Sequence, residues 1–174
     1  MQAAGDVAAG ETTVTCVDYS AADVHEQRVG DLATFLEQHR PAWSAVRWID
    51  VVGFADLDAI HALAAKYELH PLALEDLLSH SQRPKIDAYG GAGSNLNARL
   101  FISTRALHLR EGRLRSAPVS IFLGHTTVLT FQRTSTDVFA PVRHRLTVPG
   151  SRLRADDASF LTYSLLDAVV DACF

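Results

Sequence analysis

Carboxylates are the side chains in this sequence that could most readily do chemistry. Glu75 and Asp76 are adjacent, and Asp167 and Asp171 are four residues apart. Residues at that spacing share one face of a helix, where two like charges repel unless a cation lies between them. Carboxylate oxygens without histidine or cysteine ligands favour a hard cation such as Mg²⁺ or Ca²⁺. Two other interpretations stay open: a solvated helix edge, or first-turn carboxylates stabilised by the helix dipole.

Other kinds of site have weaker support. The eight histidines contain no H-x-x-x-H pair and have no neighbouring pair of cysteines, so their spacing does not favour zinc. The glycine-rich residues 90–95 lack the phosphate-binding motifs G-x-x-x-x-G-K-[ST] and G-x-G-x-x-G, and are typical of a flexible loop. There is no G-x-S-x-G motif, and neither cysteine has an evident activating neighbour. The sequence therefore predicts a protein that is not an enzyme.

The pattern of apolar residues predicts the elements that position these carboxylates. We expect strands or extended segments over residues 12–19, 46–52, 84–89, 96–109, 119–123 and 127–132. We expect helices over residues 31–39, 56–67, 71–78 and 137–146, and a last helix capped by Asp156 or Asp157. Residues 56–67 carry a clear apolar face, formed by Leu57, Ile60, Leu63, Ala64 and Tyr67. Pro71 suits the first position of the helix that carries Glu75 and Asp76.

This order of elements favours an α/β fold. The hairpin expected around residues 124–126 requires a mixed, partly antiparallel sheet, and helices on both faces would give a three-layer α/β/α sandwich. The chain has 174 residues, which suits one domain over residues 12–174, preceded by a disordered leader at residues 1–11. Because the last helix reaches residues 171–174 without a stop signal, we expect the chain to end in mid-helix.

Composition limits the possible partners. The net charge of −4 argues against nucleic-acid binding, and no apolar run approaches the roughly 20 residues that cross a bilayer, so we expect the chain itself to be soluble. Cys16 and Cys173 are far apart and form no C-x-x-C pair. They indicate a reducing compartment and two small buried hydrophobic side chains.

Several segments, taken together, carry a family resemblance. Residues 70–76 (HPLALED) with 82–85 (QRPK) resemble a characteristic segment of the CorA family of divalent-cation transporters. Residues 119–123 (VSIFL) leading to 128–132 (VLTFQ), residues 137–143 (DVFAPVR) and residues 163–171 (YSLLDAVVD) are similar as well. These blocks occur in order and cover most of the chain from Tyr67 onward.

The resemblance implies the N-terminal cytoplasmic α/β domain of a homopentameric transporter in the cell inner membrane. Such a protein moves Mg²⁺, and often Co²⁺ or Ni²⁺, through transmembrane helices and a Gly-Met-Asn signature that this sequence does not contain. It also implies weak regulatory Mg²⁺ sites between neighbouring domains. Glu75 and Asp76 match one acidic pair of those sites and Asp167 matches another contributing carboxylate, whereas Asp171 is a less certain participant.

Two alternatives remain beside this interpretation. One is the equivalent domain of a zinc-transporting relative, and the other is a stand-alone metal-sensing or interaction domain with the same fold. The membrane would be reached only through helices outside this chain, which by itself could be a monomer or a dimer. Residues 88–97 are longer and richer in glycine than the family's usual link between these strands, which is a local departure from the resemblance.

Overall fold

The computed structural model describes residues 11–79, 83–90, 99–133 and 137–173, apart from the side chains of residues 108 and 110. Their strands form one seven-stranded sheet in the order β2-β1-β3-β7-β6-β5-β4. The strands are β1 (Thr13–Tyr19), β2 (Val24–Arg28), β3 (Val46–Val52), β4 (Lys85–Tyr89), β5 (Arg99–Arg110), β6 (Arg113–Leu123) and β7 (Thr127–Gln132). Strands β3 and β7 run parallel, and the other described pairs run antiparallel. The mixed sheet expected from the sequence is confirmed.

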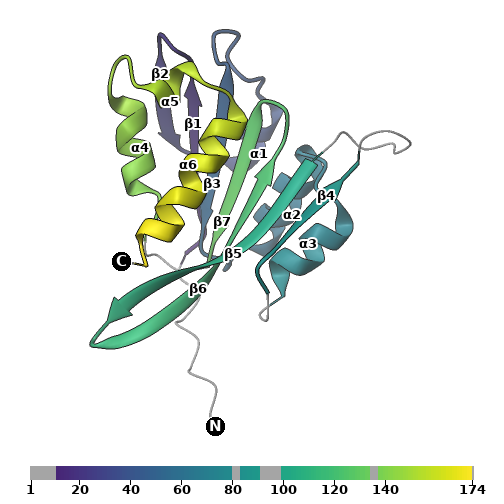
Figure 1. Cartoon of the computed structure of the whole chain (residues 1–174). Coiled ribbons are helices and arrows are strands. Elements are labelled where there is room, and N and C mark those ends of the chain that lie inside the picture. The colour runs from purple at the N-terminus through teal and green to yellow at the C-terminus, as the bar shows by residue number, and fades with distance from the viewer. Residues whose placement is uncertain (1–10, 80–82, 91–98, 134–136, 174) are drawn as a thin grey trace.

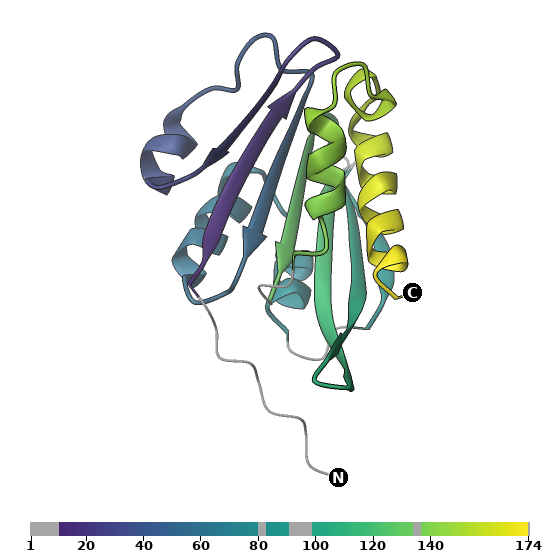
Figure 2. The same ribbon diagram turned by 90° about the vertical axis from the view of Figure 1, so that its left-hand side faces the viewer.

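Helices cover both faces of this sheet. They are α1 (Leu32–Glu37), α2 (Leu57–Lys66), α3 (Pro71–Leu78), α4 (Ala140–Thr147), α5 (Arg152–Ala155) and α6 (Ala158–Asp171). Helices α1, α2 and α3 lie on one face and α4, α5 and α6 on the other, which confirms the three-layer α/β/α sandwich (Figures 1 and 2). Each face has its own apolar core, because alternate residues of a strand point to opposite sides of a sheet.

Three aspartates set the starts of helices as the sequence predicts. The Asp31 carboxylate accepts a hydrogen bond from the Thr34 N–H (3.2 Å) at the start of α1, and Asp56 accepts one from the Ala59 N–H (2.9 Å) at the start of α2. Asp157 caps α6 by accepting from the backbone N–H groups of residues 159 and 160. Of the two candidate caps for the last helix, Asp157 is therefore the one used.

A buried carboxylate connects the central strands to α4. Asp50 of β3 accepts hydrogen bonds from Thr130 Oγ1 (2.6 Å) and Gln132 Nε2 (3.1 Å) of β7, and forms an ion pair with Arg143 of α4 (2.9 Å). Trp48 Nε1 donates to the same Thr130 hydroxyl (2.9 Å), and the Trp48 ring packs edge-on against Phe139. The network joins β3 and β7 to α4, so it fixes how α4 lies on the sheet.

Several expectations from the sequence need correction. Strand β2 and helix α5 were not predicted, and α4 begins at Ala140 rather than at residue 137, although Val138 and Phe139 are buried as expected. Leu57, expected on the inner face of α2, occupies the first helical position and is 48% exposed. Cys16 is buried, but Cys173 near the end of α6 is exposed. The expected leader, the glycine-rich loop and the start of the strand at residues 96–98 lie outside the described residues, apart from residues 11 and 90.

Candidate metal site

Helix α3 presents the acidic pair to the outside of the domain. Its inner face is anchored by Ala73 and Leu77, which are almost fully buried. Its first turn is fixed by Pro71 and by the His70 side chain, whose Nδ1 accepts a hydrogen bond from the Leu72 N–H (3.2 Å). Because the residues at positions 75 and 76 leave the buried face, the first is exposed and the second is half-buried.

Asp76 does not stand alone, because Lys85 at the start of β4 forms an ion pair with its carboxylate. The same Lys85 ammonium lies 2.7 Å from Asp87 Oδ2, since residues 85 and 87 point to the same side of β4. Hydrogen bonds to Asp76 and then to Asp87 raise the pKa of Lys85 above its usual value. The result is a cluster of two carboxylates around one cation at the surface.

Asp87 is an acidic group that sequence reasoning did not single out. Its signal in the sequence is the lysine-aspartate pair two residues apart in an extended segment, which places both side chains on one face of the strand. The Tyr89 hydroxyl donates to Asp87 (3.4 Å), and the Tyr89 ring stacks on His70 with 4.4 Å between ring centroids. These contacts join the edge strand β4 to the start of α3.

Asp167 lies on α6, on the opposite face of the sheet from α3 (Figures 1 and 2). Leu161, Leu165 and Val169 point into the core, and this leaves Asp167 exposed together with Asp171 one turn later. Neither aspartate has an ion-pair partner among the described residues. The structure therefore does not bring Asp167 to the acidic pair of α3 within one chain.

No group of three or more histidine, cysteine or acidic side chains that could hold a metal ion occurs within the described part of the chain. The donors at the two acidic surfaces are nevertheless carboxylate oxygens, which suit Mg²⁺ better than Zn²⁺. One chain thus presents acidic side chains on α3 and on α6, on opposite sides of the domain.

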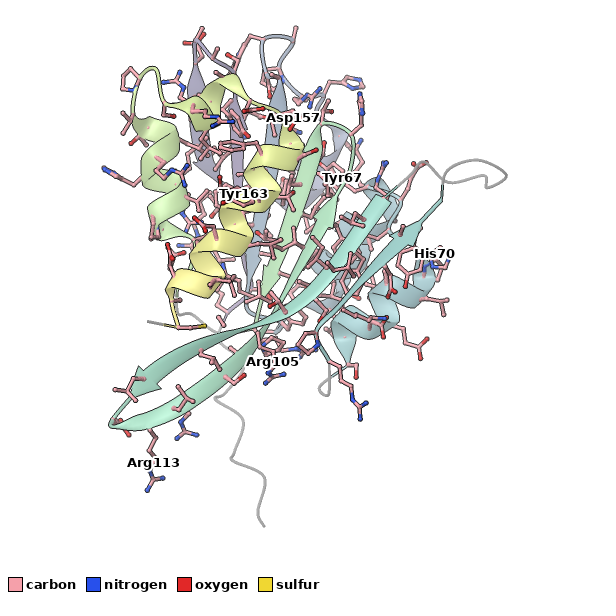
Figure 3. The ribbon with its side chains drawn as sticks, in the orientation of Figure 1. Tyr67, His70, Arg105, Arg113, Asp157 and Tyr163 are labelled. Atoms are coloured by element: carbon pink, nitrogen blue, oxygen red, sulfur yellow. The ribbon has the colours of Figure 1, made fainter. Side chains whose placement is uncertain are left out.

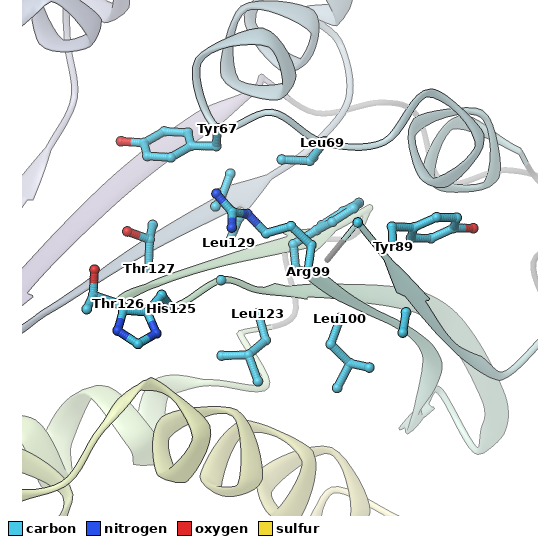
Figure 4. Close-up of a pocket in the computed structure, with 14 residues that line it drawn as sticks. Tyr67, Leu69, Tyr89, Arg99, Leu100, Leu123, His125, Thr126, Thr127 and Leu129 are labelled. Atoms are coloured by element: carbon cyan, nitrogen blue, oxygen red, sulfur yellow. The ribbon is translucent and has the colours of Figure 1, made fainter. Parts of the chain in front are cut away.

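A cavity of about 750 Å³ opens at one end of the sheet, between the end of α2, the end of β4 and the β6–β7 turn (Figure 4). Arg99 crosses it, 3.9 Å from the Glu68 carboxylate, and packs on Gly124, where a Cβ atom would lie only 3.3 Å from Arg99 Nε. Its described lining includes Tyr67, Tyr89, His125 and Thr127 but no carboxylate. The described lining of this cavity therefore offers no carboxylate ligand for a divalent cation.

Comparison with known proteins shows the family. The model of the CorA-like Mg²⁺ transporter protein family matches residues 43–174. The chain is 32% identical over 161 residues to the cobalt/magnesium transport protein CorA of Thermotoga maritima, and 33% identical over 140 residues to the putative metal ion transporter YfjQ of Bacillus subtilis. These alignments cover 92% and 80% of this chain. The chain therefore belongs to the CorA-like Mg²⁺ transporter family, which is a family of transporters rather than of enzymes.

Solved structures show the same fold. The alignment with the soluble domain of CorA from Methanocaldococcus jannaschii covers 91% of this chain and 56% of the CorA chain, with a TM-score of 0.61 and 13% identity. The alignment with the full-length CmaX protein (TM-score 0.61, 16% identity) covers 91% of this chain and 45% of the CmaX chain. The ZntB cytoplasmic domain from Vibrio parahaemolyticus (TM-score 0.60, 12% identity) covers 92% and 57%.

The chain spans 44% and 39% of the lengths of the two curated relatives. Among the described residues, no helix combines the length and the hydropathy needed to cross a membrane.

Proposed function

We propose that this chain is the cytoplasmic regulatory domain of a CorA-type transporter of Mg²⁺, with Co²⁺ or Ni²⁺ as further substrates, in the inner membrane. In this proposal, Glu75 and Asp76 of one subunit and Asp167 of its neighbour hold a regulatory Mg²⁺ between them. Family membership supports the class of protein, and the oxygen-only donors support Mg²⁺ over Zn²⁺. The homopentamer implied by the resemblance would repeat this contact around a ring.

The observation that carries the proposal is the placement of the carboxylates. Glu75 and Asp167 are exposed and Asp76 is half-buried, and their helices α3 and α6 lie on opposite faces of one domain. A single chain cannot bring them together, whereas two copies side by side can place α3 of one against α6 of the next. Such a contact repeats head to tail and can close a ring, which is the geometry of a cyclic oligomer.

The mechanism follows from electrostatics. Carboxylates that face one another across two subunits repel, and they hold the subunits together once a bound cation neutralises them. If the closed state of the transporter binds Mg²⁺ more tightly than the open state, a fall in cytosolic Mg²⁺ shifts the population towards the open state. Mg²⁺ retains several waters, so a few carboxylates are sufficient and weak affinity is expected.

The test is Mg²⁺-dependent protection of the full-length transporter from proteolysis. Asp76→Asn and Asp167→Asn should each shift the protecting Mg²⁺ concentration upward, because each removes a charge from one half of the site. Glu26→Gln is the matched control, since Glu26 is exposed on the distant edge strand β2 and should leave protection unchanged. Protection that is identical in all three variants and the parent would remove these carboxylates from the sensing role.

A further inference from the structure

Strands β5 and β6 extend beyond the rest of the sheet as a two-stranded arm. Strand β4 pairs with its neighbour β5 only as far as Ser103, and strand β7 pairs with its neighbour β6 only from Val119 onward. The two strands nevertheless continue to pair with each other out to Arg110 and Arg113. We call residues 104–118 the arm; Figure 1 shows it projecting past the end of α6, on the side away from α3.

The arm ends in a tight turn and is tied at its base. Glu111 and Gly112 both have positive φ (53° and 70°), as a two-residue hairpin turn of type I′ requires. Near the base, Arg105 Nε donates to Ser116 Oγ (2.6 Å), which bridges the two strands. The arm is therefore a defined hairpin rather than an irregular loop.

The far half of the arm is apolar and basic. Leu109 and Leu114 lie directly opposite each other and are 74% and 69% exposed, the two most exposed large apolar residues of the described chain. Arg113 beside them is exposed and Arg115 is partly exposed, and neither has an acidic partner among the described residues. Figure 3 shows Arg113 near the far end of the arm.

An isolated two-stranded hairpin is at best marginally stable in water, and exposed apolar pairs at its end add to this cost. A partner surface that covers the leucines and neutralises the arginines would stabilise the arm. Such a surface must be concave, apolar and acidic.

One groove of the domain has these properties. It has a volume of about 540 Å³, lies between α2 and α3, and is lined by His61, Pro71, Leu74, Glu75, Leu78 and Ser79. Exposed Leu57 lies one turn before His61 on the same face of α2. Glu75 is exposed and has no ion-pair partner among the residues described. We call this the α2–α3 groove, and no arm residue of the same chain lines it.

We propose that the arm of one copy of this chain docks in the α2–α3 groove of a second copy. Leu109 and Leu114 fill the apolar groove, and the arginines of the arm face Glu75 at its edge. This inference rests on the proposed function in one respect: that proposal sets α3 of one subunit against α6 of the next, and the arm projects beside the end of α6 (Figure 1). Glu75 is then shared between the arm and the metal site.

Cross-linking of this chain tests the contact directly. The background is Cys173→Ser, since Cys173 is exposed and Cys16 is buried. Leu114→Cys on the arm and His61→Cys in the groove are prepared separately, and both side chains are exposed in the parent. A short bismaleimide should cross-link the two proteins only when they are mixed. One chain that carries both cysteines should form a ladder of dimers, trimers and larger products, because an arm-to-groove contact repeats head to tail.

Matched variants identify the chemistry of the contact. Adding Leu109→Ser to the arm partner should lower the cross-linking yield about tenfold, because it removes an apolar side chain that the contact buries. Arg113→Ala and Glu75→Gln should each lower the yield less, and more at low salt than at high salt. Lys66→Ala, on the exposed face of α2, is the control that should leave the yield unchanged.

Other results would overturn the proposal. If the Leu114→Cys protein alone were cross-linked as efficiently as the mixture, the arms would pair with arms. If the mixture formed no cross-link, the arm would not contact the α2–α3 groove and the proposal would be wrong. Binding of the chain to phosphatidylglycerol vesicles that is lost in Leu109→Ser, without cross-linking, would assign the arm to a lipid surface instead.

The same experiment in EDTA and with Asp167→Asn separates this inference from the proposed function. Cross-linking should persist under both conditions, because the docked arm needs no metal. Persistent cross-linking without Mg²⁺-dependent protection of the full-length protein would refute the metal sensor alone. Intact protection without cross-linking would refute the arm contact alone.

Discussion

Lys85 at the start of β4 forms an ion pair with Asp76 of α3, so one of the carboxylates proposed to hold Mg²⁺ already faces an ammonium group. This pair raises the pKa of Lys85. A lysine whose pKa rises on folding contributes stability below its unfolded pKa, near 10.5, and loses that contribution only as the pH rises through the higher folded value. Lys85 therefore stays charged at every physiological pH and, under the proposed function, competes with Mg²⁺ for Asp76.

Lys85→Ala should strengthen Mg²⁺ binding at the Asp76 side of the site. The pair is about one-third exposed, so its removal should raise the affinity only about two- to fivefold. The measurement is the Mg²⁺ concentration that half-protects the full-length transporter from proteolysis. Lys66→Ala is the control, because Lys66 is the only other lysine of the sequence and has no described ion pair. Weaker protection in Lys85→Ala than in the control would contradict the prediction.

The chain by itself should bind Mg²⁺ weakly. Helices α3 and α6, which carry Asp76 and Asp167, lie on opposite faces of the sheet, so under the proposed function each chain in dilute solution offers only part of a site. We expect a dissociation constant of about millimolar or weaker by titration calorimetry. A tight, saturable site on the monomer would show that one chain holds a complete set of ligands.

Removing Asp50 should destabilise the domain severely. Asp50→Ala leaves the buried Thr130 and Gln132 without their carboxylate acceptor and Arg143 with Asp137 as its remaining ion-pair partner, and breaking one side of a buried charge pair costs about 3–5 kcal/mol in the free energy of unfolding. Asp137→Ala is the comparison, because Asp137 contacts the same Arg143 but its side chain is 45% exposed, so its loss should cost about 1 kcal/mol or less. Urea denaturation of both variants measures the difference, and equal costs would refute the role of the buried network.

Local chemistry explains which elements the sequence predicted. The caps at Asp31, Asp56 and Asp157 and the proline of α3 act within a few residues, so their helices start where expected. Strand β2 has a mostly exposed polar surface at the edge of the sheet and no apolar alternation, so no local pattern indicated it. The outer half of β6 was missed because residues 113–116 are mostly exposed, and continuous burial begins only at Val119.

The candidate site depended on long-range geometry. The sequence indicated that Glu75 and Asp76 leave the apolar face of their helix, and this is confirmed. It could not indicate that Lys85 would fold back onto Asp76, because that contact depends on where β4 joins the sheet edge. Nor could spacing show that α3 and α6 cover opposite faces, since this is decided by the path of the chain between distant strands.

The two cysteines should differ sharply in reactivity, contrary to the expectation that both are buried. Burial, and then the neighbouring charge of Asp18, raise the pKa of Cys16 to about 12, whereas Cys173 is exposed. At pH 8, the native chain should react with a thiol reagent at Cys173, and Cys16 should react about a thousandfold more slowly because so little thiolate forms.

The control variants separate burial from charge at Cys16. Cys173→Ser should abolish the fast reaction, and urea should restore a reactive thiol from Cys16. Asp18→Asn removes the smaller cause of the raised pKa but leaves the side chain buried, so Cys16 should stay protected wherever the variant remains folded. Rapid labelling of Cys16 in the folded parent chain would mean that β1 opens far more readily than its place between β2 and β3 indicates.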